Sequence, residues 1–236
     1  MIAVIVPAHN EEACLGACLE SLRHAALHPT LAGESVVRIV VLDSCTDESQ
    51  AIAQASGCHW LTVGVRNVGT ARATGAQWAL DSGARWLAFT DADTTVAPDW
   101  LAAQLMQQSD AVCGTVSVED WLDYGSHMQD HYKTTYLDRD GHRHIHGANL
   151  GVSAAAYQRA GGFAPLASSE DVAFVQALST SGAVIAWSAA PRVSTSARKN
   201  FRAPLGFGAT LARIDEEAHA YASGRSPLVV ASPPNT

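Results

Sequence analysis

The chain has 236 residues, of which 47% are hydrophobic and 16% are charged, so it can build a substantial core and does not resemble a disordered chain. The formal net charge of -8 argues against broad, sequence-independent nucleic-acid binding, which needs a basic surface. Five cysteines without a CxxC spacing indicate reduced core thiols, as in a cytoplasmic protein.

The apolar segments are too short for membrane insertion. The run Met1–Pro7 is shorter than a signal peptide needs and carries no basic flank. No apolar run reaches the ~20 residues that a membrane helix requires. We therefore expect a soluble, cytoplasmic protein.

Strands and helices alternate four times along the first 110 residues. Apolar, β-branched runs predict strands at residues 2–6, 36–42, 60–63 and 86–90. Helices are predicted between and after them, at residues 11–26, 48–56, 68–83 and 98–109. We expect Pro7 to end the first strand and Asn10 to cap the first helix. This alternation predicts an α/β fold with a mostly parallel sheet.

The pattern changes after residue 110. Residues 119–141 mix aromatic, charged and histidine residues and are expected to form an excursion over the site. Ser169 is expected to cap a helix that begins at Glu170. The other elements predicted here are strands at 111–118, 145–152 and 183–188, helices at 153–159 and 205–222, and a loose tail at 226–236.

Polar clusters follow three of the predicted strands, at Pro7–Glu12, Asp43–Asp47 and Asp91–Asp93. Sites in such sheets lie beyond the carboxyl ends of the strands, so the three clusters should converge on one crevice. Asp91 and Asp93 would repel each other, and a cation would offset that cost. Mg²⁺ is commonly held by one or two carboxylates plus substrate phosphates. A metal site is favoured over a capping Asp beside a surface Asp.

Other polar residues have two interpretations each. In one interpretation Asp43 accepts a hydrogen bond from a ring N–H of a nucleotide base and Asp47 caps the next helix. In the other, both residues only cap the turn. Arg72 follows Gly69-Thr-Ala at a helix start, where it could meet a phosphate or face solvent. Arg66 and Lys199 are further scarce cations in this acidic chain.

His142, His144 and His146 alternate along a predicted strand, so their side chains would share one face. A metal cluster is conceivable, but without nearby cysteines a polar loop or pocket wall is favoured. Glu170-Asp171 suits either a helix N-terminus or a catalytic base.

Taken in order, these motifs resemble family 2 glycosyltransferases with the GT-A fold, over roughly residues 1–190. The stretches that carry the resemblance are Pro7-Ala-His-Asn-Glu-Glu12, Val40-Val-Leu-Asp-Ser-Cys-Thr-Asp47, Gly69-Thr-Ala-Arg72 with Gly75, Phe89-Thr-Asp-Ala-Asp93, His146-Gly-Ala-Asn149, Gly161-Gly-Phe163 and Ser169-Glu-Asp171. The segment Thr195-Ser-Ala-Arg198 also resembles one found in some bacterial members.

The resemblance implies an inverting transfer of sugar from a nucleotide-diphosphate donor, UDP by default, to an acceptor hydroxyl, with Mn²⁺ or Mg²⁺. It implies a single domain over 1–225, with a nucleotide-sugar half at 1–110 and an acceptor half at 111–225. Asp171 is the implied base, beside Glu170, and Asp93 and Asp91 are the implied metal ligands. The implied nucleotide contacts are Pro7, Ala8, His9, Glu11, Asp43, Arg72, Asp91 and Ala92.

The acceptor is not specified and could be a saccharide, a small molecule or a lipid-linked sugar; no nucleic-acid partner is expected. The resemblance places the acceptor or donor sugar near His146, Gly147 and Asn149. Position alone adds Trp121, Tyr124 and His127, within the segments 119–146 and 195–210 that are expected to shape the acceptor site.

The chain departs from the family pattern at several points. Leu42 stands where the family often has an acid, which bears on base preference. A Gln-x-x-Arg-Trp motif and membrane helices are missing from the sequence, which argues against a processive polysaccharide synthase. His219 is the only histidine after Asp171, so His146 or a water is a further candidate for a third metal ligand.

Two alternative functions share some of these motifs. Phe89-Thr-Asp-Ala-Asp-Thr-Thr95 also fits the nucleophile motif of haloacid-dehalogenase phosphatases, in which Asp91 would attack phosphorus and Asp93 would handle the proton. A non-catalytic sugar-nucleotide-binding protein on the same scaffold is the other alternative. The phosphatase motif usually opens its fold, whereas two polar strand ends precede it here. The Asp91/Asp93 pair together with Glu170-Asp171 favours an enzyme over a binding protein.

Overall fold

A computed structural model of the chain describes residues 1–118, 121, 124–166, 168–198, 208, 211, 214 and 215, without the side chains of 126 and 127. The chain divides into unit 1, Met1–Glu119 with Leu137–Ser196, and unit 2, Asp120–Tyr136 with Ala197–Thr236. The predicted halves 1–110 and 111–225 stay a prediction. Outside the described residues lie Lys199, His219, the tail at 226–236 and most of the helix predicted at 205–222.

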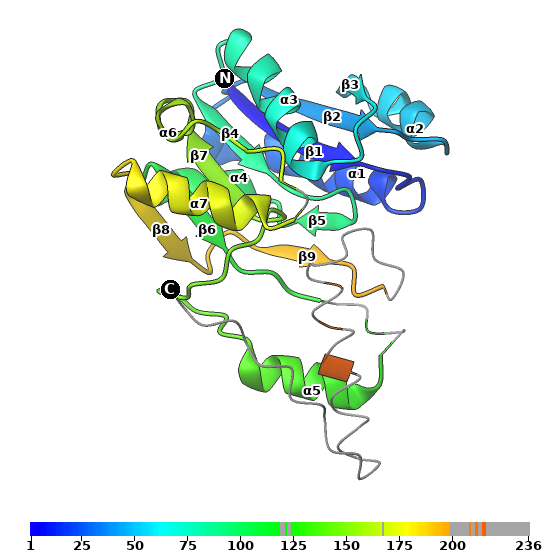
Figure 1. The fold of residues 1–236 in the computed structure, drawn as a ribbon, viewed down its shortest axis with the longest axis vertical. Coiled ribbons are helices and arrows are strands. Elements are labelled where there is room, and N and C mark those ends of the chain that lie inside the picture. Colours follow the sequence, from blue (N-terminus) through cyan, green and yellow to red (C-terminus); the bar gives the residue numbers. More distant parts are fainter. Residues whose placement is uncertain are drawn as a thin grey trace. The chain divides into compact units, whose positions relative to one another are not determined.

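Unit 1 is built on a seven-stranded sheet in the order β3-β2-β1-β4-β7-β6-β8 (Figure 1). β3, β2, β1 and β4 are parallel, β7 runs antiparallel to β4 and β6, and β8 is parallel to β6. The predicted α/β fold with a mostly parallel sheet is therefore confirmed. The strands span Ile2–Ala8 (β1), Val36–Asp43 (β2), His59–Val63 (β3), Trp86–Phe89 (β4), Ala111–Gly114 (β6), Leu150–Ser153 (β7) and Ile185–Ser188 (β8).

Helices cover both faces of this sheet. Alternate residues of β1 show the division: Ala3 and Ile5 belong to a core shared with α3, α6 and α7, whereas the equally buried Val4 and Val6 point to the face with α1 and α4 (Figure 1). The helices of unit 1 are Leu15–Ala26 (α1), Ser49–Ala55 (α2), Val68–Asp81 (α3), Trp100–Met106 (α4), Ala154–Ala160 (α6) and Glu170–Thr180 (α7), with a 3-10 turn at Pro29–Leu31.

The first strand is longer than predicted, because β1 continues through Pro7 to Ala8. β4 pairs with β1 only as far as Ile5, so Pro7 pairs with β2 alone, opposite Val41. A proline is tolerated in a strand where its missing N–H is not needed by a neighbour on that side.

The first helix starts later than predicted, at Leu15 rather than Glu11. Asn10 adopts a left-handed conformation with φ of 55°, and its Oδ1 accepts the N–H of Thr46 at 2.8 Å. Asn10 therefore joins two loops of the sheet edge instead of capping a helix.

Two short strands were not predicted, β5 (Thr94–Val96) and β9 (Val193–Thr195), which pair antiparallel in a second sheet. β7 also begins at Leu150 and not at residue 145, so the three histidines lie in a loop before it. Tertiary pairing decides such short strands, because three residues carry too little pattern to be recognised alone.

The described part of unit 2 contains α5 (Ser126–Thr135) and an aromatic cluster. The ring centroid of Trp121 lies 5.5 Å from that of Tyr132 and 6.3 Å from that of Tyr124, and Tyr132 stacks on Tyr136 at 4.6 Å. Trp121 and Tyr124 stay predicted acceptor contacts, and the side chain of His127 lies outside the described residues. Across the described residues, no helix has both the length and the apolar character needed to cross a bilayer.

Candidate active site

The loops after β1 and β2 interlock at the carboxyl edge of the sheet. The N–H of Glu11 donates to Ser49 Oγ at 2.9 Å, and the N–H of Glu12 donates to Asp47 Oδ2 at 2.9 Å. His9 lies on the same edge, with its Nδ1 2.6 Å from the backbone oxygen of Asp43. The predicted convergence of these two polar clusters is confirmed, and Pro7 and Ala8 lie buried beneath them.

Asp43 organises the loop that leads into α3. Its carboxylate accepts the backbone N–H groups of Val65, Arg66 and Asn67 at 2.9, 2.8 and 2.6 Å, and the hydroxyl of Ser44 at 3.0 Å. Burial would raise the pKa of Asp43, but these hydrogen bonds outweigh burial and lower it. Three of the four bonds fall on Oδ1, so Oδ2 keeps the capacity for one further donor.

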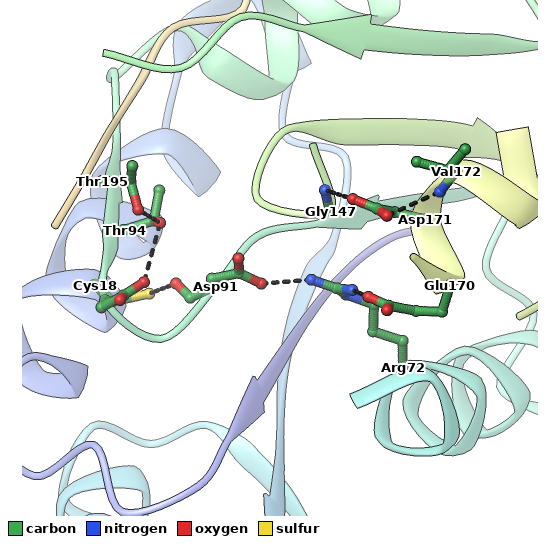
Figure 2. A network of polar contacts seen from close by, with 10 residues as sticks. Cys18, Arg72, Asp91, Thr94, Gly147, Glu170, Asp171, Val172 and Thr195 are labelled. Atoms are coloured by element: carbon green, nitrogen blue, oxygen red, sulfur yellow. Dashed lines mark hydrogen bonds and ion pairs between the residues drawn. The ribbon is translucent and has the colours of Figure 1, made fainter. Parts of the chain in front are cut away.

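The loop after β4 carries Asp91, Ala92 and Asp93. The thiol of Cys18 donates to the backbone oxygen of Asp91 at 3.4 Å, which joins the loop to α1 (Figure 2). On the other side, Thr94 Oγ1 donates to Thr195 Oγ1 at 2.9 Å, within the β5–β9 pair. The loop is therefore held on both sides, with Ala92 buried between the two carboxylates.

This loop suits a hard divalent cation that arrives with a diphosphate. Among the residues that the structure describes, no group of three or more His, Cys, Asp or Glu side chains could hold a metal ion. Two carboxylates are a sufficient protein share for Mg²⁺ or Mn²⁺ when phosphate oxygens and waters complete the shell. Asp91 and Asp93 thus fit the predicted metal as partial ligands.

Arg72, on α3, is buried and pairs with carboxylates from two other elements (Figure 2). Its Nη2 donates to Asp91 Oδ1 at 2.6 Å, and its Nη1 donates to Glu170 Oε1 of α7. Burial opposes its charge, but Asp91 and Glu170 outweigh burial and raise the pKa of Arg72. Carboxylates thus engage both ends of the Arg72 guanidinium, and the predicted contact of Arg72 with the nucleotide stays a prediction.

Asp171 follows Glu170 in the first turn of α7 but is bound differently. Its Oδ2 accepts the N–H of Gly147 at 2.9 Å, and its Oδ1 accepts the N–H of Val172 at 2.8 Å. The predicted cap, Ser169, has a left-handed backbone with φ of 56° and makes no side-chain capping bond. Of the two predicted catalytic acids, only Asp171 is more than marginally exposed, so it is the better base candidate.

Gly147 and Asn149 are both framework residues. A Cβ atom on Gly147 would lie 2.3 Å from Arg72 Nη2, so only glycine lets this backbone pack against the guanidinium. Asn149 is 1% exposed, and its amide is satisfied by Trp100 Nε1, Thr115 O and Pro191 O. The predicted contact of Asn149 with the acceptor or donor sugar stays a prediction.

His142, His144 and His146 stack although they are not on a strand. Successive ring centroids lie 5.4 and 5.9 Å apart, with planes inclined by 17° and 26°. The predicted shared face is thus reproduced by a loop, in a stack that leads toward Asp171. The pKa of His146 is lowered to about 4, mainly by burial and then by the charge of a protonated His144. The negative charge of Asp171 opposes this shift but has a smaller effect.

Acid should therefore destabilise the fold partly through His146. Between pH 6.5 and 4 the unfolded chain binds a proton at this residue that the native state does not, so stability falls as pH falls. We expect His146→Gln to flatten the dependence of the melting temperature on pH in this window. The matched control is His24→Gln, at an exposed histidine of α1. A wild-type slope in His146→Gln would contradict the expectation.

A hollow of about 640 Å³ lies away from these residues, along α3. Its walls are formed by residues of α3 including Trp78, by Leu61 of β3, and by Phe163 and Pro165. Asp81 is its only charged lining residue and none of the predicted site residues borders it, so it does not suit a diphosphate.

Two contributors were not singled out individually from the sequence. Phe163 lies under the Arg72 guanidinium, with its ring centroid 5.7 Å from Cζ, and Thr195 supports the Asp91–Asp93 loop. Both belonged to stretches of the family resemblance, Gly161-Gly-Phe163 and Thr195–Arg198. Their separation from Arg72 and Thr94 along the chain hides the contacts from any local pattern.

Comparison with known proteins gives one family and a consistent fold. The family model described as Glycosyl transferase family 2 matches residues 3–160, and no curated protein matches the chain. A Staphylococcus aureus TarS 1–349 structure in complex with UDP-GlcNAc is 16% identical, with a TM-score of 0.63 over 90% of this chain and 64% of that one. The mannosyltransferase PcManGT from Pyrobaculum calidifontis, in complex with GDP-Man and Mn²⁺, is 18% identical, with a TM-score of 0.64 over 96% and 65% of the two chains.

The chain therefore spans just under two thirds of these two structures, and only 46% of a longer TarS structure that it matches at 17% identity with a TM-score of 0.61. At such identities the likeness extends to the fold. The GT-A architecture expected from the sequence is confirmed by it.

Proposed function

The chain belongs to glycosyl transferase family 2, and from this membership we propose that it transfers a sugar from a nucleotide-diphosphate donor to an acceptor hydroxyl with inversion at the anomeric carbon. The observation that carries the proposal is the polar network at the carboxyl edge of the sheet. That network joins Asp91 through Arg72 to Glu170, directly beside Asp171. A metal-binding loop and a base candidate are thereby held by one set of contacts.

Asp171 is proposed as the general base. The N–H of Gly147 donates a hydrogen bond to Asp171 Oδ2, and this bond fixes the orientation of the carboxylate at the start of α7. In the transfer, Asp171 takes the proton of the acceptor hydroxyl as that oxygen bonds to the anomeric carbon and the bond to the diphosphate breaks. A single displacement of this kind inverts the anomeric centre.

Asp93 and Asp91 would hold Mn²⁺ or Mg²⁺ together with the donor diphosphate. When bound, the metal supplies charge stabilisation to the departing diphosphate. Asp91 is already oriented by Arg72, which leaves its Oδ2 for the ribose or the metal. Among the described residues His146 does not form a three-residue metal group with these two acids, so a water is the remaining candidate for a further ligand.

The nucleotide is proposed to lie over the ends of β1 and β2. Pro7 and Ala8 form the floor there, and His9, Glu11 and the remaining acceptor capacity of Asp43 Oδ2 face the base and ribose. UDP is the favoured donor nucleotide because TarS has a structure in complex with UDP-GlcNAc. GDP is the second choice because PcManGT has a structure in complex with GDP-Man. The acceptor or donor sugar is proposed to lie near His146 and Gly147 of unit 1.

The two alternative functions are set aside. A haloacid-dehalogenase phosphatase would need Asp91 as nucleophile, but this carboxylate is paired with a buried Arg72 and the chain belongs to a glycosyltransferase family. The same membership makes the chain an enzyme of the glycosyltransferase class and not a mere binding protein.

Nucleotide binding is the direct test. We expect UDP with Mn²⁺, present at about 100 times its dissociation constant, to stabilise the fold by about 2.7 kcal/mol. Asp93→Ala should lose the Mn²⁺-dependent part of this stabilisation. The measurement is a thermal-shift panel of UDP, GDP, dTDP and CDP, each with and without Mn²⁺.

Asp99→Ala is the matched control, because Asp99 is exposed, follows the same loop and makes no side-chain bond to α4. It should respond to nucleotide like the wild type. Failure of all four diphosphates to stabilise the wild-type protein would overturn the donor site.

A further inference from the structure

The Arg72 guanidinium is shared between two acids. Asp91 belongs to the proposed donor and metal site, and Glu170 lies next to the proposed base, Asp171. Asp91, from the loop after β4, is 36% exposed at its side chain, whereas Glu170, on α7, is 8% exposed (Figure 2). Arg72 and Glu170 lie 98 positions apart in the sequence, so no local requirement of either element explains their pairing.

The guanidinium has little freedom to leave this position. The backbone of Gly147 packs directly against Nη2, and the Phe163 ring lies 5.7 Å from Cζ. Its Nε–H meets no acceptor among the described residues and is buried. The guanidinium therefore keeps its two carboxylate partners, and a change in the charge of one carboxylate alters how strongly Arg72 compensates the charge of the other.

One positive charge faces two negative charges, so neither carboxylate is fully compensated. Because Glu170 is almost inaccessible to water, it depends on Arg72 for the compensation of its charge. If Glu170 were neutral, the guanidinium would pair with Asp91 alone. Asp91 would then present less negative charge to a metal and its diphosphate.

We propose that Glu170 is a positioning residue that keeps Asp91 available to the donor and metal by holding the second arm of Arg72. This inference rests on the proposed function, because it concerns the affinity of the donor site. It assigns to Glu170 a role different from that of Asp171: Glu170 acts through Arg72 on the donor side, and Asp171 acts on the acceptor proton.

Calorimetry with Mn²⁺ and UDP, or whichever of the four diphosphates the wild type binds, tests the inference. Glu170→Gln should weaken nucleotide binding by about fivefold or more, the lower end of coupling between separate sites. Asp171→Asn removes the same charge from the next residue, which makes no hydrogen bond to Arg72 and acts on it more weakly than Glu170 does, and should change the affinity by less than about twofold. Glu20→Gln, at an exposed Arg–Glu pair on α1, is the surface control.

An unchanged affinity in Glu170→Gln would overturn the inference, as would an equal loss in Asp171→Asn, which would indicate a general effect of charge. Either result leaves the proposed function standing. Absence of binding in the wild type would overturn the proposed function and, with it, this role of Glu170.

Unfolding measurements test the shared cation without any ligand. Asp91→Asn and Glu170→Gln each leave Arg72 one carboxylate, so both single variants should fold. The double variant removes both partners of a buried cation, and its loss of melting temperature should exceed the sum of the single losses. Additive losses would show that Arg72 is not shared.

Discussion

Replacing Asp171 with asparagine is expected to slow sugar transfer by about 10²- to 10⁴-fold, the usual contribution of a general base. The amide keeps one oxygen that can accept the Gly147 N–H bond and gives up only the bond from Val172 of its own helix, so the α7 terminus should stay in place. What is lost is the ability to accept the acceptor proton. The rate is measured as the nucleoside diphosphate released from the donor in a single turnover. The sugar is transferred either to the acceptor that the wild type uses or to water.

The matched control for this variant is Asp81→Asn, at the exposed end of α3, where the carboxylate accepts only a side-chain bond from Gln77 among the contacts of the described residues. This variant should transfer sugar at the wild-type rate. Asp171→Asn should also bind Mn²⁺ and UDP as the wild type does, which separates a defect in chemistry from one in binding. Full activity of Asp171→Asn would remove Asp171 from the base role.

Replacing Arg72 with methionine is expected to destabilise the fold by about 3–5 kcal/mol, because it leaves a buried carboxylate on Glu170 without its cation. For a chain of this size each kcal/mol lowers the melting temperature by about 2–4 °C, so a loss of roughly 10 °C follows. Methionine retains most of the side-chain volume and its contact with Phe163. Urea denaturation gives the free energy, and calorimetry gives the melting temperature.

The surface pair Arg23–Glu20 supplies the comparison, since both of its side chains are about half exposed. Arg23→Met should leave the melting temperature almost unchanged, as exposed pairs contribute little to stability. Combining Arg72→Met with Glu170→Gln should recover part of the loss, because the uncompensated charge is then removed. Equal stabilities of Arg72→Met and Arg23→Met would contradict the burial argument.

The parallel half of the sheet was predictable because its signals are local. The strands β1, β2, β3 and β4 are short apolar runs, and each is followed by a helix with its own pattern. The polar clusters at Pro7–Glu12, Asp43–Asp47 and Asp91–Asp93 follow from the same pattern, since polar residues at strand ends gather at one edge of a parallel sheet. The expected family and fold rest on these loops.

Errors occurred where a residue's partner lies far along the chain. Asn10 has the side chain of a helix cap, but its Oδ1 accepts the N–H of Thr46, 36 positions along the chain. Short strands such as β5 were missed for the same reason. A hydrogen-bonding group carries no information in sequence about which of several acceptors it will meet.

The amino-acid sequence alone specifies the α/β architecture, the order of the polar loops and the two acid pairs, Asp91 with Asp93 and Glu170 with Asp171, because these depend on hydrophobic periodicity and on neighbours a few residues apart. The difference between the acids arises from the folded structure. Arg72 reaches Glu170 across 98 positions, Gly147 reaches Asp171 across 24, and burial leaves Glu170 with a cation and Asp171 with a single backbone donor from outside its own helix. Long-range packing decides which acid is buried beside a cation and which stays accessible. This difference separates Glu170, the positioning residue, from Asp171, the proposed base.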